Sequence, residues 1–167
     1  MDPTHITPFV ASVQNVFSTM LQLPVTVGDP AIKADPNQSH DVTAIIGMSG
    51  DVVGSVALAF SSDTARRVVA LFCGMEIEPD SPDFADAVGE LANMVCGGAK
   101  AGFPDTSRVS ISVPSVIVGA GHTIARQSDM PCVLIPCETD CGDITIEVAI
   151  RPAPQPVNDN TAAEASA

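Results

Sequence analysis

Aromatic and basic residues are the two classes that this sequence has least of. It contains no tryptophan and no tyrosine, and only 7 of its 167 residues are lysine or arginine, against 20 aspartates and glutamates. The formal net charge of −13 at pH 7 repels phosphate backbones and anionic lipid surfaces. Proteins that hold single-stranded nucleic acid also need aromatic platforms on which bases stack. The composition therefore argues against a nucleic-acid partner or a membrane surface, and favours a partner with basic or mixed charge.

Long hydrophobic runs and a secretory signal are missing as well. No segment approaches the roughly 20 apolar residues that a membrane-spanning helix needs. The N-terminus, MDPTHITPFVASVQ, lacks a basic flank and a small-residue cleavage site, so we expect a cytoplasmic protein. Hydrophobic residues still make up 46% of the chain, which is enough for one domain with a core of its own.

The cysteines indicate neither a disulfide framework nor a metal site. Their number is odd, and in a chain without a secretory signal free thiols are expected. Zinc ligation by the last three is possible on paper, but their spacings are not CxxC and no fourth ligand is evident, so no metal site is predicted. None of the three histidines stands in a pattern that would activate a thiol. The five cysteines are Cys73, Cys96, Cys132, Cys137 and Cys141.

Hydrophobic residues recur at helical spacing in three segments. The first helix is predicted over residues 4–22, with Thr4 as a possible N-cap and Pro24 as the residue that stops it. The third helix is predicted over residues 82–101.

The second helix is predicted in SDTARRVVALFCGM, after a cap at Ser61 or Ser62 and before Gly74. Its inward-facing residues are expected to be Val68, Val69, Leu71 and Phe72.

Apolar residues alternate or cluster as in β-strands both before the second predicted helix and after the third. Residues 41–60 form two apolar runs around Ser49-Gly50-Asp51, which predicts a hairpin with a tight turn. GDPAIKADPNQSH, rich in Pro, Asp and Asn, is predicted to be a loop. Three later strands are predicted in RVSISV, CVLIPC and DITIEVAIR, and a turn at residues 139–142 joins the last two. In DITIEVAIR one face is apolar and consists of Ile144, Ile146, Val148 and Ile150.

These elements predict an α+β fold, in which helices cover a single antiparallel sheet. A helix followed by a hairpin occurs in each half of the chain, which hints at a weak internal pseudo-repeat. We expect one domain over residues 1–151. The remaining residues, 152–167, are polar and of low complexity, and we predict that this tail is disordered.

The third helix, which contains DAVGELANMVCGGAK, carries three polar side chains in an otherwise small and apolar segment. At about 100° per residue, Asp86, Glu90 and Asn93 fall within an arc of roughly 60°. Gly97 extends this line and would let a partner's surface approach the backbone closely. The opposite side is the expected core stripe of Phe84, Val88, Leu91 and Val95.

From spacing alone, a solvated polar face is the simpler explanation, because every amphipathic helix has one. No lysine follows Glu90 or Asn93 at the fourth position, so the line does not have the pattern of a helix-stabilising ion pair.

The segment DAVGELANMVCGGAK resembles the motif helix of the CheX-like chemotaxis phosphatases, relatives of CheC and FliY. The family's pattern is Asp or Ser, three residues, Glu, two residues, Asn, and a proline farther along the chain. Asp86, Glu90, Asn93 and Pro114 match it. TPFVASVQNVFSTM, TAIIGMSGDVVGSVALAF and ETDCGDITIEVAI resemble the flanking segments of the same family, so the likeness covers residues 4–151.

The resemblance implies a phosphatase that stimulates hydrolysis of the aspartyl phosphate on a CheY-type receiver domain. Asn93 would orient the attacking water, and Glu90 would pair with the receiver's lysine. Asp86 and Gly97 would contact the partner at the rim. The protein would need no cofactor of its own, because the receiver supplies Mg²⁺, and it would form a homodimer through its sheet.

Two features separate this chain from its relatives. Gly98 stands where related sequences often have a polar residue, so affinity or partner choice would differ if that residue holds the partner. CheC-type members carry two copies of the motif, whereas this chain has one, which points to the CheX branch.

Other functions remain open at this stage. A CheX-like domain that binds receivers without hydrolysis would have nearly the same residues, and the link to FliY suggests a motor adaptor. A dinucleotide site at Gly119-Ala120-Gly121 lacks the following helix and acidic residue. GMSGD fits a hairpin turn better than a nucleophile elbow.

Overall fold

The fold of the chain is taken from a computed structural model, which describes all residues except 1, 105–107, 128 and 157–167. Most of the tail that was predicted to be disordered lies outside the described residues. The last strand continues to Pro152, and the backbone N–H of Ala153 donates to the carbonyl of Asp51 over 2.8 Å.

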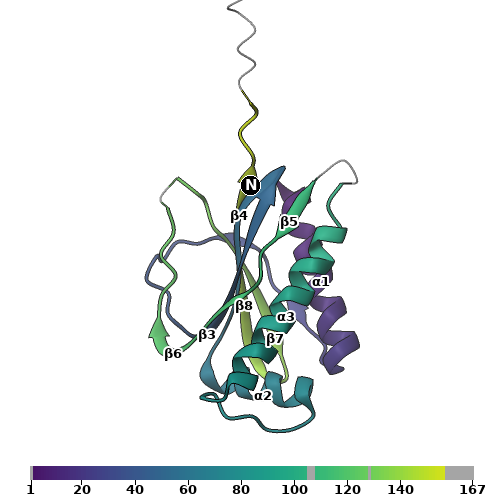
Figure 1. The fold of residues 1–167 in the computed structure, drawn as a ribbon, viewed down its shortest axis with the longest axis vertical. Coiled ribbons are helices and arrows are strands. Elements are labelled where there is room, and N and C mark those ends of the chain that lie inside the picture. The colour runs from purple at the N-terminus through teal and green to yellow at the C-terminus, as the bar shows by residue number, and fades with distance from the viewer. Residues whose placement is uncertain (1, 105–107, 128, 157–167) are drawn as a thin grey trace, which may run out of the picture.

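In the described part of the chain, one antiparallel sheet of eight strands forms the centre, and three helices pack on one of its faces (Figure 1). The main path of the sheet runs β1-β7-β8-β4-β3-β5, while β2 pairs with β7 and β6 pairs with β3. The predicted α+β class and single antiparallel sheet are therefore confirmed. The strands are β1 (Thr26–Val27), β2 (Ala31–Ile32), β3 (His40–Gly50), β4 (Val52–Phe60), β5 (Val109–Ile111), β6 (Ser115–His122), β7 (Val133–Thr139) and β8 (Gly142–Pro152).

The three predicted helices are present, with small corrections. They are α1 (Pro3–Leu21), α2 (Ser62–Cys73) and α3 (Pro82–Ala101). The N-cap of α1 is Asp2, whose carboxylate accepts the N–H of Thr4, so Thr4 itself is not the cap. Leu71 of α2 was expected to face inward but is 48% exposed, because the buried face of this short helix is narrow. Within the described residues, no helix is long and apolar enough to cross a membrane.

The two predicted hairpins meet in the middle of the sheet. β3 and β4 turn at Gly50, whose φ of 106° is a conformation that glycine adopts most readily. β7 and β8 pair from Val133 to Thr139, and the long β4–β8 ladder joins the two hairpins. Along the chain, α1 precedes the β3–β4 hairpin and α3 precedes the β7–β8 hairpin, which is the order of elements that suggested the pseudo-repeat.

Three strands were not predicted from the sequence. β6 lies in SVIVGAGH, where two glycines interrupt the alternation of apolar residues. β1 and β2 are only two residues each, and β2 lies in the segment 28–40 that was predicted to be a loop. Their backbone groups complete the edge of β7, which no local pattern in the sequence reveals.

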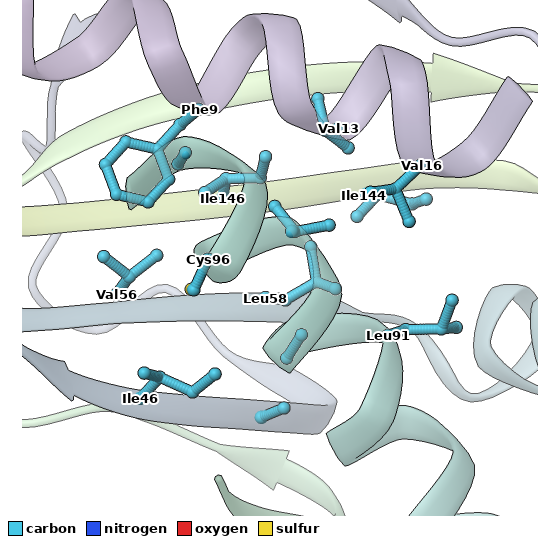
Figure 2. Packing of buried hydrophobic residues seen from close by; sticks show 14 of the residues in the cluster. Phe9, Val13, Val16, Ile46, Val56, Leu58, Leu91, Cys96, Ile144 and Ile146 are labelled. Atoms are coloured by element: carbon cyan, nitrogen blue, oxygen red, sulfur yellow. The ribbon is translucent and has the colours of Figure 1, made fainter. Parts of the chain in front are cut away.

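The hydrophobic core lies between the helices and the sheet. Figure 2 shows Phe9, Val13 and Val16 of α1 over Ile144 and Ile146 of β8. In the same layer, Leu91 and Cys96 of α3 lie over the strands of the first hairpin, where Figure 2 labels Ile46, Val56 and Leu58. The predicted apolar face of β8 is confirmed by the burial of Ile144, Ile146, Val148 and Ile150.

The other face of the sheet is covered by connecting segments, which Figure 1 shows on the side away from α1 and α3. This cover is supplied by residues 33–39, between β2 and β3, and by residues 123–127 and 129–132, between β6 and β7. Because side chains of a strand alternate between faces, Glu147, which lies between Ile146 and Val148, points to this second face.

Candidate functional site on helix α3

Helix α3 forms where a capping serine precedes a sequence with few β-branched residues. Ser81 is the N-cap, and its hydroxyl accepts the N–H of Asp83 over 3.3 Å. Pro82 occupies the first turn, where its missing N–H costs nothing. The predicted core stripe is confirmed, since Phe84, Val88, Leu91 and Val95 are all at most 2% exposed.

The predicted polar line lies on the outer side of this helix. Asp86 and Glu90 are exposed, while Asn93 and Gly97 are partly exposed. Among the described residues, none forms an ion pair with Asp86 or Glu90, or a hydrogen bond with the amide of Asn93. These polar groups are therefore available to another molecule, on a helix that the core holds firmly in place.

A hollow of about 480 Å³ lies beside Glu90, between α3 and the start of β6. Its walls combine two carboxylates with apolar groups, and they consist of Ala85, Asp86, Gly89, Glu90, Pro114 and Val116. A methyl group on Gly89 would lie 3.1 Å from Pro114 Cγ and 3.3 Å from Val116 Cγ2. Gly89 thus lets β6 approach α3 closely, and Pro114 forms one wall of the hollow.

Gly89 was not identified from the sequence, although a signal was present. Glycine inside a helix costs about 1 kcal/mol relative to alanine, so its occurrence there usually has a packing reason. The neighbour that supplies this reason, β6, was itself missed.

The two glycines near the end of the motif have different surroundings. At Gly97 an added methyl group would meet nothing within 4 Å, so the backbone is open to a partner there. At Gly98 it would lie 2.3 Å from the hydroxyl of Ser12 on α1. That hydroxyl donates to the carbonyl of Val95 over 2.6 Å. A side chain at position 98 would therefore point at α1, so glycine here serves the packing of two helices.

The chemistry that α3 offers is recognition and positioning. A carboxylate can pair with a cation, and an amide can donate and accept a hydrogen bond at once. The thiol closest in sequence, Cys96, is buried in the core, and burial raises its pKa to about 12. In the described part of the chain, no three His, Cys, Asp or Glu side chains gather as metal ligands would.

Residues 42–138 match the sequence model of a family described as "Chemotaxis phosphatase CheX". This match covers more than half of the chain. The chain belongs to the CheX family.

Individual relatives agree with this assignment. The CheY-P phosphatase CheX of Thermotoga maritima is 30% identical over 121 residues, which are 71% of this chain and 78% of that protein. A CheC-like superfamily protein from Shewanella has 33% identity and a TM-score of 0.82, with 90% of this chain and 99% of that chain covered. CheX in the CheX–CheY–BeF3–Mg²⁺ complex of Borrelia burgdorferi shares the fold at 23% identity, with a TM-score of 0.71 over 88% of this chain and 97% of that chain.

Proposed function

We propose that this CheX-family phosphatase stimulates hydrolysis of the aspartyl phosphate on a CheY-type receiver domain in chemotaxis signalling. Glu90 and Asn93 would act directly on the receiver's phosphorylated site. The observation that carries the proposal is their place one turn apart on a rigid helix, with no described residue engaging either side chain.

Asn93 is proposed to orient the attacking water. The reaction forms a bond between water oxygen and phosphorus and breaks the bond between phosphorus and the aspartyl oxygen, which yields inorganic phosphate and a free carboxylate. A helper needs no covalent intermediate for this step, because positioning the water in line with phosphorus supplies much of the acceleration. An amide suits that task, since its oxygen can accept a proton of the water while its nitrogen donates elsewhere.

Glu90 is proposed to pair with the lysine of the receiver's active site. The hollow beside it offers what a lysine side chain needs, namely carboxylates for the ammonium group and apolar walls for the methylene stem. Asp86 lies at the rim of the same hollow and would add to the attraction for a positive charge. Gly97 would allow the receiver to come close to the helix backbone farther along.

Mg²⁺ belongs to the partner in this proposal. The Borrelia CheX complex contains CheY, BeF3 and Mg²⁺. By analogy, the acidic outer face of α3 would meet a receiver site that contains a metal ion and a lysine, so the net charge of −13 favours the encounter.

The test compares Asn93→Ala with the wild type on receivers phosphorylated by a small-molecule donor. Phosphate release is followed, and binding to the BeF3-activated receiver is measured separately. We expect the rate to fall by about 100-fold while binding persists, as losing one positioning group typically costs this much. Asn15→Ala, which removes an exposed asparagine from α1, is the matched control. A wild-type rate in Asn93→Ala would refute the role of Asn93.

The same assay separates hydrolysis from binding alone. If the wild type binds activated receivers but accelerates the loss of phosphate from none of them, the chain is a non-catalytic receiver-binding member of the family.

We also propose that the protein is a homodimer that pairs through β6. In the part of the chain that is described, no strand pairs with the outer edge of β6, which Figure 1 shows at the side of the sheet. Ile117 and Val118 on this eight-residue strand are 39% and 40% exposed, whereas the opposite edge is covered by two-residue strands. A long apolar edge of this kind is a typical pairing surface.

Sedimentation of Ile117→Asp tests the dimer. We expect the monomer to predominate in this variant, while Leu71→Asp, which changes a similarly exposed residue on α2, leaves the dimer intact. A monomeric wild type, or a dimer that survives Ile117→Asp, would contradict the proposal.

We place the protein in the cytoplasm. All five cysteines are described and all are free thiols, which is typical of a reducing compartment.

A further inference from the structure

A cluster of charged side chains lies on the second face of the sheet, away from α3. Glu147 is fully buried at its centre. Its Oε1 accepts hydrogen bonds from Lys33 Nζ over 2.9 Å and from His40 Nε2 over 3.0 Å. Its Oε2 lies 3.4 Å from an Nη of Arg126 and 3.8 Å from the sulfur of Cys132.

The charges of this cluster do not balance. The side chains of Lys33 and Arg126 are only 7% and 12% exposed, and Glu147 is the one described carboxylate that accepts a hydrogen bond from either. Two buried cations therefore share a single negative charge, before any proton on His40 is counted. Uncompensated charge is costly in a poorly solvated place, so such a site attracts an anion.

The hydrogen bonding of Arg126 is incomplete as well. One terminal nitrogen donates to Ser55 Oγ over 2.5 Å and the other to Glu147. Its Nε is buried, and no described residue accepts its proton. A guanidinium has five N–H donors, and their fixed fork matches the two oxygens of a carboxylate or a phosphate.

A hollow of about 520 Å³ opens over these cations. None of the described acidic residues lines it, although acidic residues outnumber basic ones almost threefold in the chain. Neutral polar side chains add further hydrogen-bonding groups to its wall, and these belong to Asn37, Thr123 and Gln127. The volume is in the range of small-molecule sites.

We infer that this hollow binds a small molecule through an oxyanion group, a carboxylate or a phosphate, which Lys33 and Arg126 recognise. The site is independent of the proposed phosphatase function, because it lies on the other face of the sheet from α3. Glu147 neutralises part of the charge of both cations, and the ligand would neutralise the remainder.

A purely structural role is the alternative. In that case the cluster only holds residues 33–39, 123–127 and 129–132 on the sheet, and anions would have no saturable effect.

The test is a titration of the wild-type protein with inorganic phosphate and, separately, with citrate at constant ionic strength, followed by amide NMR shifts. We expect saturable shifts confined to residues 33–37 and 123–132. Arg126→Gln and Lys33→Gln should each weaken binding at least tenfold, and Arg151→Gln, which changes an exposed arginine paired with Asp129, should not. The probe that saturates at the lower concentration identifies the preferred oxyanion.

Glu147→Gln should change the affinity for the anion in the opposite direction from Arg126→Gln and Lys33→Gln. Without the internal carboxylate, the anion should bind several-fold more tightly, which a structural role does not predict. Circular dichroism shows whether each variant is folded. If a variant is unfolded, the titration of the wild-type protein still tests the inference. Absence of saturation with both probes, or equal binding by Arg126→Gln, would overturn the inference.

Discussion

The two faces of the sheet differ in the exposure and hydrogen bonding of their polar side chains. On the helical face, α3 presents Glu90 and Asn93 outward, and no described residue contacts either side chain with a hydrogen bond or an ion pair. On the second face, Glu147 is inaccessible and receives hydrogen bonds from Lys33 and His40. The first arrangement leaves polar groups open to another molecule, and the second uses most of its hydrogen-bonding capacity within the chain.

This difference has an energetic meaning. An exposed side chain without a partner adds little to stability, so it can be selected for function alone. A buried carboxylate is tolerated only when cations and donors compensate its lost hydration. Substitutions of the exposed polar residues of α3 should therefore change activity and leave stability nearly unchanged. Substitutions in the Glu147 cluster should lower stability and leave activity nearly unchanged.

The largest effect is expected for Glu147→Gln. Removing the charge leaves Lys33 and Arg126 without their shared counter-ion, and breaking a buried pair in this way costs about 3–5 kcal/mol in the free energy of unfolding. Urea denaturation measures the change, with Glu138→Gln on the exposed side of β7 as the control. Asn93→Ala should stay within about 0.5 kcal/mol of the wild type. Similar losses of stability in Glu147→Gln and Asn93→Ala would contradict the proposed difference between the two faces.

A smaller effect is expected for Glu90→Lys, and it concerns docking. If Glu90 pairs with the receiver's lysine as proposed, the new charge would repel that lysine, and KM should rise by about tenfold or more, which corresponds to losing one charge-assisted hydrogen bond. The turnover number should change less. Steady-state phosphate release over a range of receiver concentrations separates the two quantities, and Glu138→Lys controls for net charge. An unchanged KM would argue against the pairing.

A coupling of about 1 kcal/mol is expected between Ser12 and Gly98. Gly98→Ala puts a methyl group against the Ser12 hydroxyl, whose buried hydrogen bond to Val95 is then lost. In a Ser12→Ala background the clash disappears, and the higher helix propensity of alanine should make the same change neutral or stabilising. A double-mutant cycle of unfolding free energies measures the coupling. Additive effects would show that α1 and α3 do not meet at Gly98.

The smallest effect on the free energy of unfolding is expected when the pH is lowered. Burial by itself raises the pKa of Glu147, but hydrogen bonds from Lys33 and His40 and the charges of Lys33 and Arg126 lower it below its ordinary value of 4.5. The carboxylate therefore stabilises the fold fully above pH 4.5, and this contribution is lost as pH falls through the depressed pKa. The loss is smaller than that caused by substitution, because at pH values above the depressed pKa only a minor fraction of Glu147 is protonated.

The matching measurement is the stability difference between the wild type and Glu147→Gln. It should be constant from pH 7 to about 5 and shrink below pH 4.5. A difference that does not depend on pH would show that Glu147 has an ordinary pKa.

Much of the helical face could be predicted from the sequence, because its signals are local. The cap of α2 at Ser61 or Ser62, the periodicity of α3 and the turn at Gly50 each depend on residues a few positions apart. The polar line of α3 was predicted for the same reason, although the roles of Glu90 and Asn93 came from family resemblance and stay predictions.

The second face could not be predicted in this way. Lys33, Arg126 and Glu147 are separated by up to 114 residues, and none stands in a local pattern. β6 was not predicted, because its glycines interrupt the alternation of apolar residues. Without β6, the proximity of Pro114 to Gly89 could not be predicted either.

Local sequence is enough to specify the helices, the two hairpins and the outward line of α3, because dihedral preferences and hydrophobic periodicity act within a few residues of the chain. Which distant side chains share the buried cluster, and which glycines face another element, depends on the folded arrangement of the whole chain. Those contacts depend on strand register and on how β6 and the covering segments close over the sheet, and no local free-energy preference specifies them.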